Sequence, residues 1–345
     1  VWFENVSSDK PSLLHLDGAQ ATIYITMNVL ASVIGTVGNL ALIVILVVNK
    51  NFQRVGREFL LNLTISDLTV TAFASPLCII GAVKGEAYFA TVPYFCEIVA
   101  AMCLTSCFTT FVSLLFFTIS RTFFIRSRHR YLDFATKPRL IALCLICWVI
   151  GLTLEAPNIF GWGHTFDQKS HSCMWDRTGN YKYTLFISIG CIGAPLVAMA
   201  VCHVLTFKHI RDAKLMVYNH SLMKTWKETV KSSRILLIFF AAFAICWIPY
   251  TLVIAIDPLD ELPMEVHLWV TFLAHTHSTL HPIILIFTNK RMRKFFNFKN
   301  RVSPVEMDVK KHVFQTSSSL KGNGDDVKQS IGEANSYTAQ STCTI

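Results

Sequence analysis

Seven apolar runs of bilayer length limit the folds open to this chain more than any other feature of its sequence. Each has about 22–25 residues, and a helix of that length, rising about 1.5 Å per residue, crosses a hydrocarbon core of about 30 Å. The runs are continuous, whereas a membrane β-barrel alternates apolar and polar residues along each strand. The sequence therefore predicts an all-α fold, a seven-transmembrane helix bundle. The predicted spans are 24–48, 59–83, 97–119, 139–160, 183–206, 234–256 and 266–288.

The placement of charge predicts how these spans are oriented. The net charge of +9 could indicate a nucleic-acid partner, but Lys and Arg gather in alternate connections between spans, and the connection after the sixth span has only acidic charge. By the positive-inside rule, the N-terminus lies outside and the C-terminus in the cytoplasm. We therefore expect a multi-pass protein of the plasma membrane, in contact with the lipid bilayer and without a nucleic-acid partner.

The same patterns divide the chain into four parts. We expect an extracellular N-terminal segment (1–23), a transmembrane domain (24–289), a membrane-surface amphipathic helix (290–302) and a disordered cytoplasmic tail (303–345). The sequon at Asn5 predicts N-glycosylation. A hydroxyl cluster in the tail predicts phosphorylation. Its members are Thr316, Ser317, Ser318 and Ser319.

Most of the eleven cysteines fall within predicted spans, where a free thiol behaves as a small hydrophobic group. Cys96 and Cys173 are instead predicted at the outer face, in the oxidising compartment. We predict that these two form a disulfide, which ties the loop after the fourth span to the outer end of the third.

Four polar residues lie deep within predicted spans and are expected to form an intramembrane polar core: Asn39, Asp67, His277 and His281. A carboxylate or amide in hydrocarbon costs free energy unless it is paired, so these side chains should face other helices. If both histidines face Asp67, an imidazolium can take the place of a cation. Neutral histidines hydrogen-bonded in a polar core are the alternative. Hinges are predicted at Pro249 and Pro282, because proline removes a backbone bond.

Several residues at fixed places in the spans carry a resemblance to a known family. They are Gly38-Asn39, Leu63-x-x-x-Asp67-Leu, Cys96, Arg121, Trp148, Pro195, Cys246-Trp247-x-Pro249 and Pro282. Over roughly residues 24–300 the chain resembles the rhodopsin-like (class A) G-protein-coupled receptors. Within that family it is most similar to melatonin receptors and their opsin-neighbouring relatives, through Pro157-Asn158, Asp167, Ser172-Cys173, Tyr183, Pro195 and Asp257-Pro258.

The resemblance implies a receptor, not an enzyme, that transmits binding of a small extracellular ligand to a heterotrimeric G protein. Arg121 is the residue expected to couple to the G protein. Arrestin and receptor kinases, acting through the tail, are the further partners expected, and no cofactor or metal is expected. The ligand pocket is expected in the outer half of the bundle, capped by the loop around Cys173. Its expected residues are Cys103, Asn158, Tyr183, Cys191, Trp247 and His275.

Departures from the family pattern refine these expectations. Ser120 replaces the acid that usually precedes Arg121, so we expect appreciable basal activity. His281 replaces an asparagine that, in the family, helps Asp67 to hold a sodium ion, so we expect weak sodium sensitivity and a pH-dependent activation threshold.

Three replacements in the pocket argue against three ligand classes. Cys191 replaces the histidine of melatonin-type receptors, Cys103 the aspartate that pairs with amines, and His275 the lysine that binds retinal. The ligand stays unassigned, and a small, neutral or weakly polar molecule is expected.

Two other classes of membrane protein compete with the receptor. A zinc-dependent seven-helix hydrolase could use His277 and His281, four residues apart on one helical face, with Asp67 as a third ligand. A transporter is the other alternative, although neither inverted repeats nor paired broken helices are apparent in the sequence.

Overall fold

The computed structural model describes residues 12–48, 56–214 and 220–288. In this part of the chain seven helices are long and apolar enough to cross a membrane, which confirms the predicted seven-helix fold. Each predicted span lies within one of them. The helices are Gly18–Val48, Arg57–Lys84, Phe95–Arg126, Lys137–Trp162, Tyr181–Lys214, Thr229–Ile256 and Met264–Thr288.

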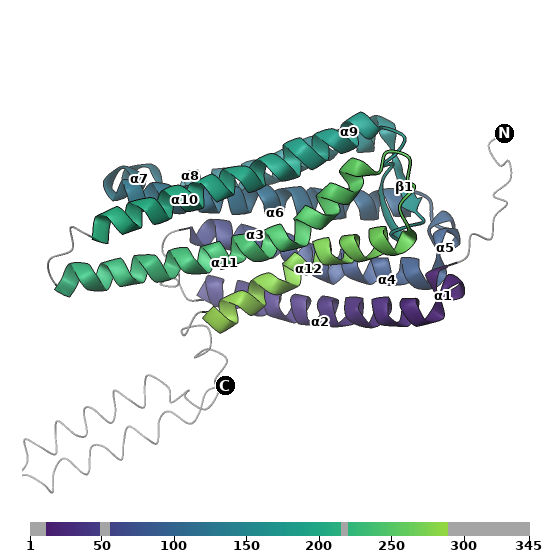
Figure 1. Ribbon diagram of the computed structural model, residues 1–345, viewed down its shortest axis with the longest axis horizontal. Helices are drawn as coiled ribbons and strands as arrows, with labels where there is room; N and C mark the ends of the chain where they lie inside the picture. Colours follow the sequence, from purple (N-terminus) through teal and green to yellow (C-terminus); the bar gives the residue numbers. More distant parts are fainter. Residues whose placement is uncertain (1–11, 49–55, 215–219, 289–345) are drawn as a thin grey trace, which may run out of the picture. The chain divides into compact units, whose positions relative to one another are not determined.

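Four spans consist of one helix each (Figure 1): α2 (Gly18–Val48), α6 (Phe95–Arg126), α11 (His220–Ile256) and α12 (Met264–Thr288). The other three contain a π-helical stretch. They are α3 (Arg57–Thr69), η1 (Val70–Ala74) and α4 (Ser75–Lys84); α8 (Lys137–Pro157) and η2 (Asn158–Trp162); and α9 (Tyr181–Leu185), η3 (Phe186–Gly193) and α10 (Ala194–Lys214). Each π-helical stretch adjoins or lies two residues from a proline, namely Pro76, Pro157 or Pro195. Because proline lacks the N–H donor and its ring displaces a preceding carbonyl, the local hydrogen-bond pattern shifts.

Short elements complete the described chain: α1 (Leu13–Leu16), α5 (Glu86–Ala90), α7 (Arg128–Phe134), β1 (His164–Asp167) and β2 (Ser172–Trp175). The two strands pair antiparallel, with Phe166 opposite Cys173. Figure 1 shows this hairpin at the same end of the bundle as α1 and α5.

Four helices extend well beyond the predicted apolar runs, namely α2 at its start, α6 and α10 at their ends, and α11 at its start. The first begins at Gly18 because the Asp17 carboxylate accepts the backbone N–H groups of Ala19 and Gln20, each at 3.0 Å. The third span continues to Arg126, so that its basic last turn lies beyond the apolar run.

The helix α6 occupies the interior of the bundle and contacts α3, α8, α10, α11 and both strands. The Asn62 amide of α3 donates to the Ser113 hydroxyl of α6 at 2.7 Å and accepts from the Trp148 indole of α8 at 2.9 Å. Close approach also needs a missing side chain, since a Cβ on Gly151 would lie 2.7 Å from the Thr109 hydroxyl oxygen. These contacts fix the rotation of α6 and therefore which of its residues face the interior.

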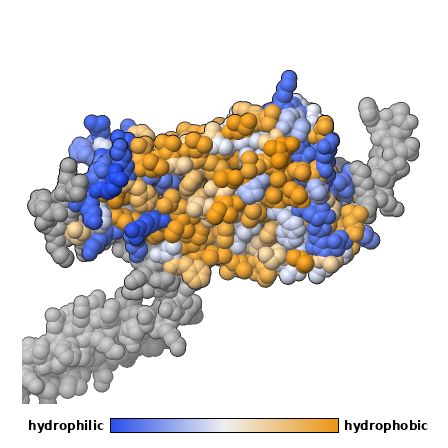
Figure 2. Space-filling model, viewed as in Figure 1, coloured by the Kyte–Doolittle hydropathy of each residue, from blue (hydrophilic) through white to orange (hydrophobic). Residues whose placement is uncertain are grey.

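The flank of the bundle is apolar between two hydrophilic ends (Figure 2). Large aliphatic side chains are exposed there, among them Val37 (63%), Leu145 (62%) and Val197 (65%). Such a continuous surface is unfavourable in water and suits contact with lipid chains.

Several predictions fall outside the described residues and stay predictions: Asn5, the segment 290–302, the tail 303–345 and its hydroxyl cluster Thr316–Ser319. The proposed domain boundaries likewise stay predictions.

Candidate functional site

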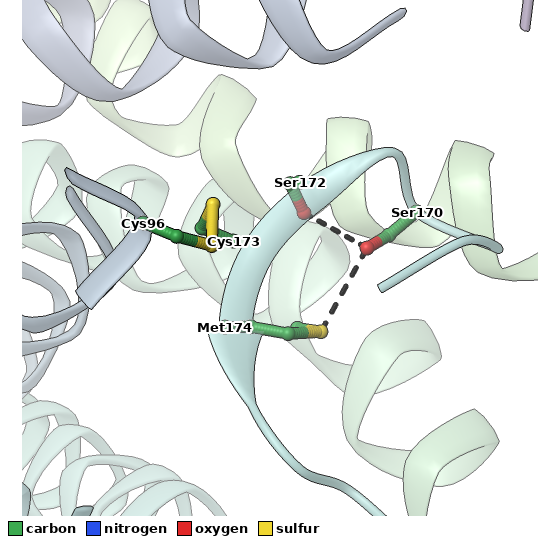
Figure 3. The surroundings of a disulfide bond; sticks show 5 residues. All are labelled: Cys96, Ser170, Ser172, Cys173 and Met174. Carbon is green, nitrogen blue, oxygen red and sulfur yellow. Dashed lines mark hydrogen bonds between the residues drawn. A yellow bond between two sulfur atoms is a disulfide. The ribbon is translucent and has the colours of Figure 1, made fainter. Parts of the chain in front are cut away.

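The bundle has two chemically different ends. We call the end that contains Cys96 and the β-hairpin the disulfide end, and the end that contains Arg121 the arginine end. Cys96 and Cys173 form the predicted disulfide, with Cα atoms 5.4 Å apart, which joins the start of α6 to β2. Figure 3 shows the Ser170 hydroxyl on the other side of β2 from the disulfide, 2.8 Å from the Ser172 hydroxyl and 3.7 Å from the Met174 sulfur. The disulfide holds the hairpin against the bundle.

A cavity lies next to β2, lined by residues of α4, α5, α6, η3, α11 and α12 as well as the strand. Three of the predicted pocket residues line it together, one on each of α6, α11 and α12: Cys103, Trp247 and His275. The lining also includes three residues that were not singled out in the sequence: Cys78, Cys107 and Tyr250. The other three predicted pocket residues are not among those that line this cavity: Asn158, Tyr183 and Cys191.

Asn158 and Tyr183 belong to a buried network that braces the loop after α8. The Asn158 amide donates to a Glu155 carboxylate oxygen at 3.2 Å and to the Tyr183 hydroxyl oxygen at 3.1 Å. That hydroxyl donates to the Leu154 carbonyl at 2.6 Å, and His164 Nε2 lies 2.5 Å from the second Glu155 oxygen. Asn158 is 2% exposed. Its amide hydrogen-bonding groups are therefore engaged within the protein.

The floor of the cavity connects to the polar core through an indole. Trp247 Nε1 lies 3.2 Å from His277 Nδ1, and the ring centroids of Trp247 and Phe111 are 4.8 Å apart. Pro249, the predicted hinge, lies within α11 two residues beyond the indole. A change at the indole can therefore act on both the kink of α11 and the histidine.

The structure brings the four polar-core residues together. His281 Nδ1 lies 2.6 Å from one Asp67 oxygen and His277 Nε2 lies 3.6 Å from the other. The Asn39 amide donates to the Ser278 carbonyl at 3.0 Å, which ties α2 to α12. All four side chains are buried.

Both histidines thus face the carboxylate, the condition under which a histidine can replace a cation. A sodium ion does not fit at Asp67 Oδ2, because the His281 ring already occupies the space beside this oxygen. Pro282, the second predicted hinge, packs closely against Gly38. A Cβ on Gly38 would lie 2.9 Å from the Pro282 ring.

At the arginine end, Arg121 has no carboxylate partner among the described residues. Its guanidinium carbon lies 5.5 Å from the centroid of the Phe124 ring. The neighbouring Ser120 hydroxyl pairs with the Tyr131 hydroxyl of α7 at 3.0 Å. Burial raises the pKa of Tyr131, so the phenol is neutral and available as a donor. Ser120 therefore anchors a loop helix where an acid would have bound the arginine.

A charged latch at the disulfide end joins the hairpin to the loop between α11 and α12. Arg177 lies 3.1 Å from an Asp167 oxygen and 3.0 Å from an Asp260 oxygen. Lys169 lies 3.2 Å from Asp260. Burial alone would raise the pKa of Asp167, but the Arg177 charge and hydrogen bonds outweigh it and lower that pKa. Asp167 is therefore ionised near neutral pH and holds the arginine in place.

Comparison with known proteins places the chain among receptors. The sequence matches the family model of the 7 transmembrane receptor (rhodopsin family) over residues 38–285. It is 23% identical over 326 residues to the adenosine receptor A2a of Homo sapiens, which covers 88% of this chain and 76% of that receptor. It is 24% identical over 284 residues to the melatonin receptor type 1B of Rattus norvegicus, with 78% and 75% covered. A third relative, the alpha-1A adrenergic receptor of Oryzias latipes, is 23% identical over 316 residues, with 81% and 66% covered.

Proposed function

Since the chain belongs to the rhodopsin family of seven-transmembrane receptors, we propose that it transmits binding of a small extracellular ligand to a heterotrimeric G protein. Members of this family are multi-pass membrane receptors and not enzymes, so we do not retain the zinc-hydrolase or transporter interpretation.

The proposed orientation places the disulfide end outside the cell, at the plasma membrane. A disulfide persists in an oxidising compartment, and the loop between α11 and α12 at that end has only acidic charge. The basic residues around Arg121 lie at the other end, where the positive-inside rule places the cytoplasm.

The proposed ligand site is the cavity lined by Cys103, Trp247 and His275. Its lining is mostly apolar with a few hydrogen-bonding groups, which supports a small, neutral or weakly polar ligand. The named relatives span adenosine, adrenergic and melatonin receptors, so they do not converge on one ligand. We propose that the chain is related to melatonin receptors by ancestry. Melatonin is not assigned as its ligand. Asn158 and Tyr183 would then act on the pocket through the loop they brace.

One observation carries the proposal most directly: the indole that lines the cavity also contacts the polar core, through the pair Trp247 and His277. A ligand that contacts this indole would bias the α11 kink at Pro249 and move the arginine end of α11 outward. Arg121 would then bond backbone carbonyls of the inserted partner helix, as a guanidinium that keeps its charge can. We propose receptor kinases and arrestin as further partners, which would act through the tail.

The test is G-protein activation in cells that express the full chain, against a panel of small neutral ligands. Trp247→Ala should lower the potency of any agonist found by at least tenfold. The matched control is Trp269→Ala, since Trp269 packs against Tyr24 in a separate cluster near α1. A potent agonist whose potency is unchanged in Trp247→Ala would contradict the placement of the ligand. Failure of every G protein to respond to the wild type, with and without agonists, would contradict the coupling.

A further inference from the structure

Soft metal ligands gather in the cavity from two different helices. Cys103 and Cys107 lie four residues apart on one face of α6, and His275 projects from α12. The Cys103 sulfur lies 3.6 Å from His275 Nε2, and the three potential ligand atoms all lie within 4.8 Å of one another. This arrangement brings two thiols and an imidazole to one point inside a largely apolar cavity.

We propose that the cavity binds one Zn²⁺ ion through Cys103, Cys107 and His275, with a fourth coordination position open to the cavity. In tetrahedral coordination, Zn–S bonds of about 2.3 Å and Zn–N bonds of about 2.0–2.1 Å put the two ligand atoms about 3.5–3.6 Å apart. The observed separation of 3.6 Å between Cys103 and His275 matches that edge. The Cys107 sulfur, within 4.8 Å of both other ligand atoms, is the third ligand.

The chemistry of the donors selects the ion. Thiolate and imidazole prefer zinc and other thiophilic ions over calcium and magnesium, which need oxygen ligands. Binding converts two thiols to thiolates and releases two protons, so two negative charges offset the two positive charges of the ion. A site of zero net charge suits this surrounding, because Cys103 and Cys107 are only 8% and 3% exposed.

The site has a consequence for the cavity that holds it. A zinc ion would join α6 to α12 near Trp247, and its fourth position would face the space in which a ligand would bind. Three protein ligands with an open position leave room for a donor atom of a small molecule. The metal site goes beyond the proposed signalling function, since purified protein can bind zinc whether or not it activates a G protein.

The experiment uses the purified full chain in lipid nanodiscs, stripped with a chelator and titrated with Zn²⁺ alone. We expect one ion per chain and about two protons released per ion near neutral pH. Cd²⁺, used as a probe in a second titration, should give the ultraviolet charge-transfer absorption of two thiolates. Cys103→Ser, Cys107→Ser and His275→Gln should each weaken zinc binding at least tenfold.

The controls remove the same chemical groups elsewhere. Cys147 is buried in α8 and His203 is buried in α10, and neither lines the cavity. Cys147→Ser and His203→Gln should therefore bind zinc as the wild type does. Equal loss in these controls, or a triple Cys103→Ser, Cys107→Ser and His275→Gln variant that still binds one ion with wild-type affinity, would overturn the proposal.

A measurement on the wild type covers the case in which a variant does not fold. Mass mapping after brief alkylation should show that Zn²⁺ protects Cys103 and Cys107 but not Cys144, which is half-buried on α8. Protection that is absent from Cys103 and Cys107, or equal at Cys144, would also overturn the zinc site while leaving the proposed signalling function standing.

Discussion

The Trp247 indole nitrogen lies 3.2 Å from His277 Nδ1, and this contact joins the cavity to the polar core. The same Nδ1 lies 2.5 Å from the Ala274 carbonyl oxygen, so it can accept from the indole or donate to the carbonyl, but not both. When Nδ1 accepts from the indole, the proton is on Nε2, which lies 3.0 Å from the Ser278 hydroxyl and 3.6 Å from Asp67. In one of its two tautomers, His277 therefore links the cavity to the Asp67 carboxylate.

Trp247→Phe keeps an aromatic ring but removes the indole donor. A net hydrogen bond contributes about 0.5–1.5 kcal/mol, so its loss should shift the resting equilibrium by a few-fold to about tenfold. We expect higher basal nucleotide exchange, measured in membranes at matched surface expression. Trp269→Phe is the control. Basal exchange that is unchanged or lower in Trp247→Phe would show that this bond does not stabilise the resting state.

Ser120 should set the basal activity of the receptor. Ser120→Asp should lower basal exchange several-fold, because a carboxylate next to Arg121 gives the guanidinium a resting partner. The substitution also removes the hydroxyl bond to Tyr131, so Tyr131→Phe is the matched control for that loss. If Ser120→Asp and Tyr131→Phe change basal exchange alike, the added charge has no effect of its own.

His281 should make signalling insensitive to sodium. We expect little sodium inhibition of the wild type, because the imidazole lies 2.6 Å from the Asp67 oxygen that an ion would need. His281→Asn should introduce sodium inhibition, since it removes the imidazole from the Asp67 oxygen and supplies an amide in its place. Strong sodium inhibition of the wild type, or no effect of the substitution, would rule this out.

The charged latch should stabilise the disulfide end over the whole neutral pH range. Because Arg177 lowers the pKa of Asp167, the pair contributes stability above the unfolded pKa of about 3.9 and loses it only as pH falls through the lower, folded value. Arg177→Ala should cost about 1.5–3 kcal/mol, the value of hydrogen bonds to a charged group, since the Asp167 carboxylate loses the guanidinium but keeps its bonds to Ser170 and the Lys169 N–H. Thermal unfolding between pH 5 and 8 should show a constant deficit. A wild type that loses stability from pH 8 to pH 5 through this pair would contradict the assignment.

Hydropathy was enough to predict the seven spans, because each apolar run has to satisfy its backbone within one helix. The Cys96–Cys173 disulfide was predictable because topology leaves these two thiols at one face. Burial cost and a spacing of one turn made it possible for both span-seven histidines to face Asp67, but the sequence did not require it.

The remaining contacts of the candidate site depend on how each helix is rotated and on the paths of the loops, which the sequence does not specify locally. Cys107 is one of eight described free thiols, and only the rotation of α6 fixed by Asn62 and Gly151 turns it toward His275. The partners Glu155 and His164 are nine residues apart across a π-helical turn and a strand start, so no helical period pairs them. Arg177 and Asp260 meet across 83 residues through the hairpin's docking.

The most direct test of the account is agonist-independent nucleotide exchange by purified receptor and a panel of heterotrimeric G proteins, compared between wild type and Arg121→Ala. Arg126→Ala is the matched control, since Arg126 is an exposed basic residue near the end of the same helix. We predict basal exchange by the wild type and by Arg126→Ala, and a loss of at least tenfold in Arg121→Ala. Wild-type exchange rates in a folded, surface-expressed Arg121→Ala receptor would contradict the claim that this end couples to the G protein.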